Sequence, residues 1–423
     1  MEQHFFEYDP ALEAAAQRAE EICRPAFARI EEIARYNGMK VLRAFTENRV
    51  AEAHFAGSTG YGYGDRGRET LDRVVAQAFG AESALVRHNF VSGTHTLTTA
   101  LFGVLRPGDV MLACTGKPYD TMDEVIGLRG SGMGSLREFG VSYRQADLRG
   151  GEPDFDAVET ALRAEKIRLA YIQRSRGYSL RPSLTVEKIG ELAEHIHTVS
   201  PDTVVMVDNC YGEFTQPQEP TQAGADLIAG SLIKNAGGGI APTGGYIAGR
   251  ADLVEQAAYR LTAPGAGFEV GATLGQSRSL FQGFFLAPHV TAEALKTAVF
   301  AAALFELLGF RATPRWDTPR TDLVETVELG SPEALITFCR GIQAGSPVDS
   351  DAAPEPWDMP GYDDKVIMAA GAFTLGSSIE LSADAPLREP YAVWMQGGLT
   401  FDTGRAGVLR AGQALREGGF LPR

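Results

Sequence analysis

The amino-acid sequence predicts an α/β fold: a large domain built on a mostly parallel β-sheet, followed by a smaller α+β domain. Short apolar runs without polar alternation, such as TVVMVD at residues 203–208, are typical of strands buried on both faces. These runs alternate with amphipathic segments of helical length, which is the pattern of strand–helix–strand units. A length of 423 residues also exceeds one ordinary domain of about 150 residues.

The first part of the chain is expected to be helical. Apolar side chains recur near helical spacing over residues 10–48, and Pro25 is expected to break this helix. A glycine-dense passage at residues 57–67 precedes an amphipathic helix at about residues 69–79. The expected strands that follow are SALVRHN, DVMLAC, RLAYIQ, TVVMVD, DLIAGSLI and GGYIAG, and the expected helices cover residues 94–104, 119–128, 156–165 and 185–198.

The pattern changes after about residue 285. A long helix at residues 291–308 and a helix that starts at SPEALITF, with Ser331 as its N-cap, alternate there with short strands. The expected strands are DLVETVEL, KVIMAAGAF, SSIELSAD and PYAVWMQGG, and residues 402–418 form the last expected helix. We therefore expect three parts, which are a helical segment at residues 1–49 that packs with the small domain, a large domain at residues 50–285 and a small domain at residues 286–423.

Composition and charge exclude several classes of partner. The formal net charge is −15, whereas a protein that coats a nucleic acid carries a clustered basic excess. The apolar stretch at residues 294–310 is too short to span a bilayer and contains Lys296 and Glu306, so no membrane partner is expected. The N-terminus lacks the pattern of a signal peptide, and the four cysteines are far apart and form no CxxC pair. A reduced, cytoplasmic protein is expected.

Three familiar site motifs are weak or missing in this sequence. Gly62, Gly64 and Gly67 satisfy GxGxxG, but no buried strand precedes them, so a loop whose Tyr61 and Tyr63 reach a ligand is favoured over a dinucleotide site. The sequence contains no HExxH and no clustered Cys/His spacing, so we expect no metal site. It also contains no GxSxG nucleophile elbow.

The most informative segment runs from residue 203 to residue 239. One apolar run ends in Asp208 and the next ends in Lys234, and ligands bind at the carboxyl ends of parallel strands. A lysine that loses hydration has a lowered pKa and attacks carbonyls, and a nearby carboxylate keeps a pyridine nitrogen protonated in pyridoxal phosphate. The glycines at 237–239 are expected to leave room for the cofactor. An exposed lysine and a turn or helix-cap aspartate are the alternatives.

Other residues fit the same cofactor. The small residues Ser92, Gly93 and Thr94 precede an expected helix, whose free N–H groups and positive dipole end bind anions. Ser231 adds a hydroxyl near Lys234, and Tyr119 offers a ring to stack on a flat heterocycle. An ordinary helix cap and a packing tyrosine are the alternatives.

Long motifs indicate a family. The segments STGYGYGDRGRETLD, VSGTHTL, GKPYDT, DNCYGEF, SLIKNAGGGIAPTGGYIAG and REPYAVWMQGGLT resemble the aluminium-resistance, methionine γ-lyase-like family, which includes cystathionine β-lyase-like proteins. These proteins are pyridoxal-phosphate enzymes of Cys/Met metabolism with fold type I, and the similarity runs from about residue 40 to the C-terminus. The resemblance implies a carbon–sulfur lyase that removes the α-proton of a sulfur amino acid, of cystathionine, cysteine or methionine type, and completes a β- or γ-elimination.

Two alternatives remain open beside the lyase. Fold type I also supports aldol cleavage, desulfurisation and transamination, because a fold does not determine a reaction. A pyridoxal-phosphate-binding protein with a regulatory or metal-tolerance role is the second alternative.

The resemblance also implies roles for single residues. Lys234 is similar to the lysine that forms the Schiff base and shuttles protons, Asp208 to the partner of the pyridine nitrogen, and Tyr119 to the stacking aromatic residue. Ser92, Gly93, Thr94 and Ser231 resemble the phosphate-binding residues.

Further roles involve a second subunit and the substrate. In related enzymes, a tyrosine and an arginine of a neighbouring subunit complete the phosphate site, and Tyr63 and Arg68 are the nearest matches, although their spacing departs from the YxR pattern. A homodimer or homotetramer is therefore expected. The substrate carboxylate needs a bidentate arginine, for which Arg388 is favoured over Arg174 and Arg176, and a surface ion pair is the alternative for each.

Overall fold

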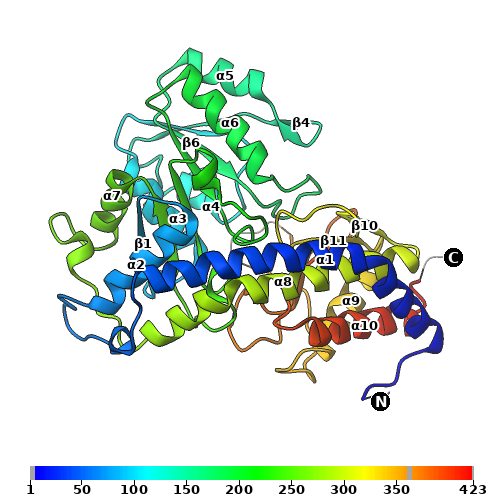
Figure 1. The fold of residues 1–423 in the computed structure, drawn as a ribbon. Helices are drawn as coiled ribbons and strands as arrows, with labels where there is room; N and C mark the ends of the chain where they lie inside the picture. The colour runs from blue at the N-terminus through cyan, green and yellow to red at the C-terminus, as the bar shows by residue number, and fades with distance from the viewer. Residues whose placement is uncertain (1–4, 360–363, 422–423) are drawn as a thin grey trace. The chain divides into compact units, whose positions relative to one another are not determined.

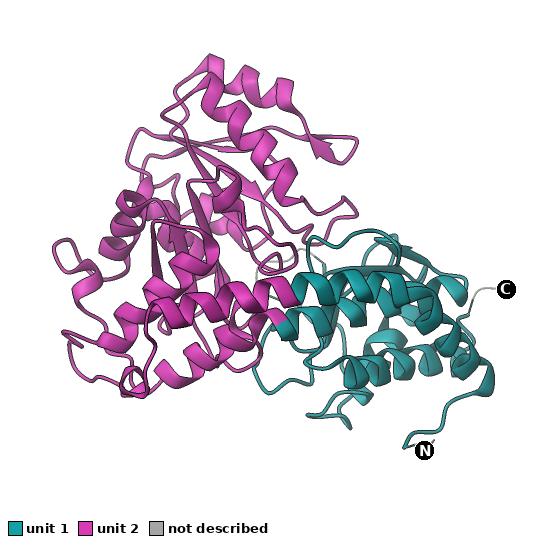
Figure 2. Ribbon diagram, in the orientation of Figure 1, with its two compact units in different colours: residues 1–34, 289–423 teal, residues 35–288 magenta. Residues whose placement is uncertain are grey.

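The computed structural model describes residues 5–359 and 364–421. Figure 2 shows two compact units, one made of residues 1–34 with 289–423 and the other of residues 35–288. Both divisions fall inside helices, because α1 spans Pro10–Glu47 and α8 spans Ser277–Leu307. The observed boundaries therefore differ from those expected after residues 49 and 285.

Helix α1 continues through Pro25, where the sequence analysis expected a break. Beyond the boundary at residue 34, its buried side chains Val41 and Ala44 join the core of the larger unit. The helix is thus shared between two cores, and the first 49 residues do not form one segment of the smaller unit.

The larger unit is built on a seven-stranded sheet with the order β1-β9-β8-β7-β6-β2-β3 (Figure 1). Strand β9 pairs antiparallel with both of its neighbours, and all other neighbours in the sheet are parallel. The predicted mostly parallel α/β fold is confirmed. The strands are β1 (Ser83–Arg87), β2 (Val110–Ala113), β3 (Ser142–Gln145), β6 (Leu169–Gln173), β7 (Val204–Asp208), β8 (Leu227–Ser231) and β9 (Gly245–Gly249), beside a small hairpin of β4 (Leu148–Arg149) and β5 (Glu152–Pro153).

Helices cover both faces of this sheet (Figure 1). In β7, Val205 and Val207 join one hydrophobic core, while Val204 and Met206 join the other, as alternation along a strand requires. The 119–128 helix is shorter than expected, since only α4 forms there. The helices are α2 (Arg66–Phe79), α3 (Gly93–Val104), α4 (Met122–Ile126), α5 (Phe155–Ala164), α6 (Val186–Val199) and α7 (Ala251–Leu261), with 3₁₀ turns η1 (Glu52–Phe55), η2 (Pro220–Ala223), η3 (Asn235–Gly237) and η4 (Gly267–Glu269).

The smaller unit carries an antiparallel sheet with the order β10-β11-β14-β13-β12. Ser331 caps helix α9 as expected, because its hydroxyl accepts a hydrogen bond from the N–H of Ala334 at 3.2 Å. The strand expected at SSIELSAD starts late, since the carboxylate of Glu380 accepts bonds from the N–H groups of Phe373 and Thr374. The elements are β10 (Arg311–Thr313), β11 (Glu325–Glu328), β12 (Val366–Ala369), β13 (Ser382–Pro386), β14 (Ala392–Gln396), α9 (Pro332–Ala344) and α10 (Phe401–Glu417).

Within the described ranges, no helix is long and apolar enough to cross a membrane.

Candidate functional site

Asp208 is the last residue of β7, where it pairs in register with Gln173 of β6 and Ala229 of β8. Its carboxylate accepts hydrogen bonds from the N–H of Cys210 at 3.1 Å and from the hydroxyl of Tyr171 at 3.3 Å. Burial raises the pKa of Asp208, and these hydrogen bonds act against that rise. The result is one fixed acidic group at the carboxyl edge of the sheet.

Lys234 lies just beyond β8 and caps the 3₁₀ turn η3. Its Nζ is 3.7 Å from the centroid of the Tyr211 ring, a cation–π geometry. Loss of hydration lowers the pKa of Lys234, but Tyr211 and Cys210 favour the ammonium form more strongly, and the pKa is raised above its ordinary value. The expected lowering is thus wrong for the protein without a ligand, because the sequence does not show these neighbours.

Tyr211 is a site residue that the sequence analysis missed. It adopts a left-handed backbone conformation, with φ of 67°, and its carbonyl accepts a bond from the side chain of Asn235 at 3.0 Å. The same Asn235 amide donates to the carbonyl of Glu213 at 2.9 Å. The residue that follows Lys234 therefore holds the loop that presents Tyr211. A tyrosine and glycine directly after a strand end were the available signal.

The small residues at the start of α3 lie beside the end of β8. The hydroxyl of Ser92 accepts the N–H of His95 at 3.0 Å and caps the helix. A Cβ built on Gly93 would lie 3.5 Å from Sγ of Cys210 and 3.6 Å from Cβ of Ser231, so these distant parts of the chain meet. Thr94 makes a 2.8 Å hydroxyl contact with Thr121. Helix N–H groups and hydroxyls together suit a phosphate.

The backbone of Tyr119 is hydrogen-bonded to the last residue of strand β6. Its N–H donates to the side chain of Gln173 at 2.6 Å, and Gln173 is the register partner of Asp208. The Tyr119 ring is half-buried, with its centroid 6.0 Å from that of Tyr178. Tyr119 and Asp208 therefore lie at the same edge of the sheet.

Tyr63 and Arg68 differ sharply in exposure. Tyr63 is 70% exposed and lies beside Tyr61, with ring centroids 5.6 Å apart. Arg68 is only 2% exposed, and its Nη1 donates to the carbonyls of Gly62 and Gly271 at 2.8 and 2.7 Å. Arg68 thus connects two loops of its own chain, and its contact with a neighbouring subunit's phosphate stays a prediction.

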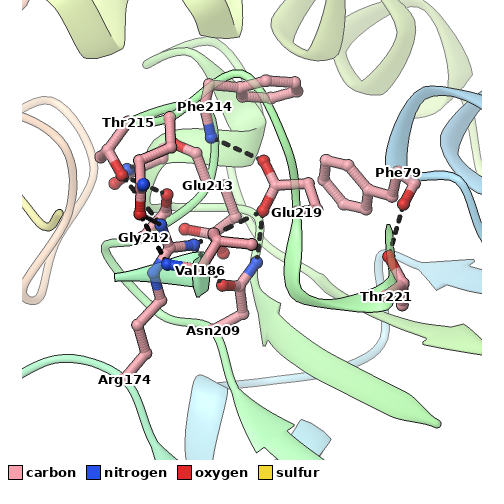
Figure 3. A network of polar contacts seen from close by, with 12 residues as sticks. Phe79, Arg174, Val186, Asn209, Gly212, Glu213, Phe214, Thr215, Glu219 and Thr221 are labelled. Atoms are coloured by element: carbon pink, nitrogen blue, oxygen red, sulfur yellow. Dashed lines mark hydrogen bonds and ion pairs between the residues drawn. The ribbon is translucent and has the colours of Figure 1, made fainter. Parts of the chain in front are cut away.

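The three candidate arginines for a substrate carboxylate also differ in exposure. Arg174 is fully buried, donates to Asn209 at 2.8 Å and lies 3.6 Å from the carboxylate of Glu219 (Figure 3), and its role toward a substrate stays a prediction. Arg176 is 2% exposed, beyond the end of β6. Arg388 belongs to the smaller unit, where its half-exposed side chain pairs with Asp364 at 3.3 Å.

A buried polar network lies under the site, and the sequence analysis missed it. The hydroxyl of Tyr246 donates to Glu213 at 2.7 Å and accepts a hydrogen bond from the side-chain amide of Asn209. The same amide donates to Glu219 (Figure 3). Burial raises the pKa of Glu213 to about 8. A Cβ on Gly230 would lie 2.5 Å from the Glu213 carboxyl, so the network packs directly on β8. It thereby fixes Asn209, the residue after Asp208.

The glycines after Lys234 serve the backbone. A Cβ on Gly237 would lie 1.6 Å from the carbonyl oxygen of Leu232, and one on Gly238 would lie 2.3 Å from that of Gly283 in α8. Close contact between backbones explains the glycines at 237 and 238, and room for a cofactor stays a prediction.

Lys234, Asp208, Ser231 and the start of α3 thus meet at one edge of the sheet, where they offer an amine, a carboxylate and anion-binding donors. In residues 5–359 and 364–421, no three His, Cys, Asp or Glu side chains form a group suited to a metal ion. The donors fit a cofactor with a carbonyl, a ring nitrogen and a phosphate.

Comparisons with known proteins agree with this geometry. A family described as methionine gamma-lyase matches residues 12–416. A candidate cystathionine beta-lyase involved in aluminium resistance from Clostridium acetobutylicum is 51% identical, with a TM-score of 0.94 and 96% of each chain covered. A carbon–sulfur lyase involved in aluminium resistance from Clostridium novyi NT is 50% identical, with a TM-score of 0.93 and the same coverage. The protein YnbB of Bacillus subtilis is 49% identical over 92% of each chain.

Proposed function

Because the chain belongs to the methionine gamma-lyase family, we propose that it is a pyridoxal-phosphate-dependent carbon–sulfur lyase acting on a sulfur amino acid. One observation carries the proposal: Lys234 follows β8, Asp208 ends the adjacent β7, and Gly93 at the start of α3 lies beside Ser231. An amine, an acid and an anion-binding site therefore lie together at the carboxyl edge of the sheet.

The residues present fit pyridoxal phosphate. The helix N–H groups of α3, with the hydroxyls of Ser92, Thr94 and Ser231, hold the phosphate. Asp208 keeps the ring nitrogen protonated, and the Tyr119 ring packs on the heterocycle. When bound, the cofactor supplies an electron sink for the carbanion that forms next to the substrate nitrogen.

Lys234 has two tasks in this reaction. Its Nζ would hold the cofactor through the cofactor's carbonyl group, and it would serve as the base that takes the α-proton of the bound amino acid. Tyr211 raises the pKa of Lys234 against the effect of burial, and its ring positions Nζ, which lies 3.7 Å from the ring centroid. The amine must therefore lose a proton before it reacts, and the thiol then leaves from the β or γ carbon.

Arg388 is proposed to bind the substrate carboxylate, and Arg176 is the alternative. The exposure of Arg388 supports this role, since a half-exposed guanidinium can donate two parallel hydrogen bonds to a carboxylate that arrives from solution. Tyr63 is proposed to contact the cofactor phosphate of a neighbouring subunit in a homodimer or homotetramer, supported by its 70% exposure. A cytoplasmic location is supported by four cysteines that form no disulfide.

Product analysis tests this function. Cystathionine, cysteine, methionine and threonine are added separately to the purified protein loaded with pyridoxal phosphate, and keto acid, ammonia, thiol and glycine are measured. Keto acid, ammonia and a thiol from a sulfur amino acid are expected. Glycine from threonine would instead identify aldol cleavage, and no product from any amino acid would reject the enzyme assignment.

A further inference from the structure

A small cavity in the larger unit is lined by two buried arginines. Arg68 comes from α2 and Arg87 from the end of β1, and Ser277 at the start of α8 lies on the same cavity wall. Their exposures are 2%, 4% and 2%. The space amounts to about 10 Å³, which holds roughly one water-sized species.

The arginines leave many donors unused. Nη1 of Arg68 donates to two backbone carbonyls, and Nη1 of Arg87 donates to both oxygens of Asp72 at 2.7 and 2.9 Å. Nε and Nη2 of both guanidinium groups, and Oγ of Ser277, are buried and have no partner among the described residues. A guanidinium group only donates, so these atoms require an acceptor that the protein does not supply.

The two guanidinium groups lie close to each other beside Gly271. A Cβ built on Gly271 would lie 4.0 Å from Nη1 of Arg68 and 4.0 Å from Nε of Arg87. Burial and the charge of Arg87 both lower the pKa of Arg68, as expected for two close cations.

The negative groups nearby are already engaged. Asp72 neutralises Arg87, and the Asp65 carboxylate accepts bonds from the Arg68 N–H and from the hydroxyls of Ser58 and Thr273. Burial and Arg87 lower the pKa of His88, the remaining titratable side chain on the cavity wall, so its ring is neutral at neutral pH. Asp65 and Asp72 thus balance the two guanidinium charges formally, and the cavity stands out by its unused N–H groups.

We propose that this cavity binds one small monovalent anion of chloride size, held by Arg68, Arg87 and Ser277. A water molecule accepts two hydrogen bonds and must donate two, whereas these side chains offer donors in excess, which a spherical anion accepts from all sides. The anion also stabilises the loop that carries Tyr61 and Tyr63, because Arg68 donates to Gly62 within it.

Thermal unfolding of the full-length protein in sodium chloride or sodium gluconate at equal ionic strength tests the site. Gluconate is too large to enter. A saturable rise in unfolding temperature, roughly 3 °C at tenfold excess over the dissociation constant, is expected with chloride only. Arg68→Met should abolish this rise, and Arg66→Met, which removes an exposed guanidinium from the same helix, should keep it. An equal rise in the two variants would overturn the proposal.

A second measurement covers the case in which Arg68→Met does not fold. Ser277→Ala removes one donor without removing charge, and it should increase the chloride concentration at half-maximal effect several-fold. Crystals of the unmodified protein grown in sodium bromide should show one anomalous scattering peak within hydrogen-bond distance of Arg68 and Arg87. A water in the cavity and no bromide peak would refute the anion site.

Discussion

The chemistry of single residues here depends on neighbours that come from other parts of the chain. Burial lowers the pKa of Lys234, but Tyr211 and Cys210 raise it above its ordinary value, although the residue follows an apolar strand. Arg174 and Arg68 are buried, and their guanidinium groups donate to acceptors within the chain. In each case a residue's type is visible in the sequence, while its protonation state and accessibility arise from tertiary contacts.

Lys234→Ala should abolish both turnover and the visible absorbance of bound pyridoxal phosphate, because no other amine is proposed to attach the cofactor. Absorption spectra after incubation with pyridoxal phosphate and assays of keto acid measure this. Lys188→Ala is the control, since Lys188 lies on α6 and pairs with Glu191. Turnover in the Lys234 variant would remove that residue from the reaction.

Glu213 should make stability depend on pH. Its pKa is about 8 in the folded protein against 4.5 in the reference state, so the folded protein binds more protons between these values. The contribution of Glu213 to the free energy of unfolding is fully present below about pH 4.5 and is lost as pH rises to about 8. Over this range the free energy of unfolding falls by at most about 1.4 kcal/mol per pH unit. Urea unfolding from pH 6 to 9 should show a shallower decline for Glu213→Gln. The exposed control Glu194→Gln should match the unmodified protein; equal slopes in all three proteins would contradict the assignment.

Much of the candidate site follows from strand ends alone. Asp208, Ser231 and Gly93 come together because parallel strands place their carboxyl ends at one edge. Tyr211 and Glu213 escaped prediction because a left-handed turn and a bond from Asn235, distant in sequence, set the loop conformation. Such contacts have no local pattern in the sequence.

At the scale of elements, local signals failed where packing decides the outcome. Pro25 stays inside α1, although proline removes one helical hydrogen bond. Strand β9 has the same apolar character as the parallel strands of the sheet, so its antiparallel direction could not be predicted from GGYIAG. Because β9 runs antiparallel to β8, the segment that contains Lys234 is a loop joining two adjacent strands. At the base of this loop, the N–H of Leu232 donates to the carbonyl of Gly244 at 2.9 Å.

The loop between β8 and β9 packs so closely on α8 that one added methyl group should destabilise the protein. Gly238→Ala places a Cβ 2.3 Å from the carbonyl oxygen of Gly283 at a residue with φ of +54°. We expect a loss of more than about 2 kcal/mol in the free energy of unfolding, measured with denaturant. Gly265→Ala has φ of +83° and open space, so it should lose only about 1 kcal/mol. Equal losses would show that backbone strain alone acts.

At the scale of the whole molecule, the proposed oligomer can be tested by complementation. If Tyr63 serves the site of a neighbouring subunit, Lys234→Ala and Tyr63→Ala chains contain complementary intact parts. After random mixing of equal amounts, about half of the dimers are mixed and each has one intact site, so activity should return in about a quarter of all sites. Light scattering verifies the oligomer, and denaturation followed by refolding mixes the chains. No recovery in a verified mixed dimer would place Tyr63 in its own subunit's site or outside both.

The divided smaller unit has a consequence for synthesis on the ribosome. Residues 1–34 are made before the larger unit, but the rest of their unit, residues 289–423, is made after it. The apolar face of α1, including Leu12, Ala16 and Ala19, which are at most 1% exposed in the folded protein, therefore lacks its partners for about two thirds of translation. Cotranslational folding must begin with the larger unit, and the nascent N-terminal helix is the segment on which a chaperone has the longest time to act.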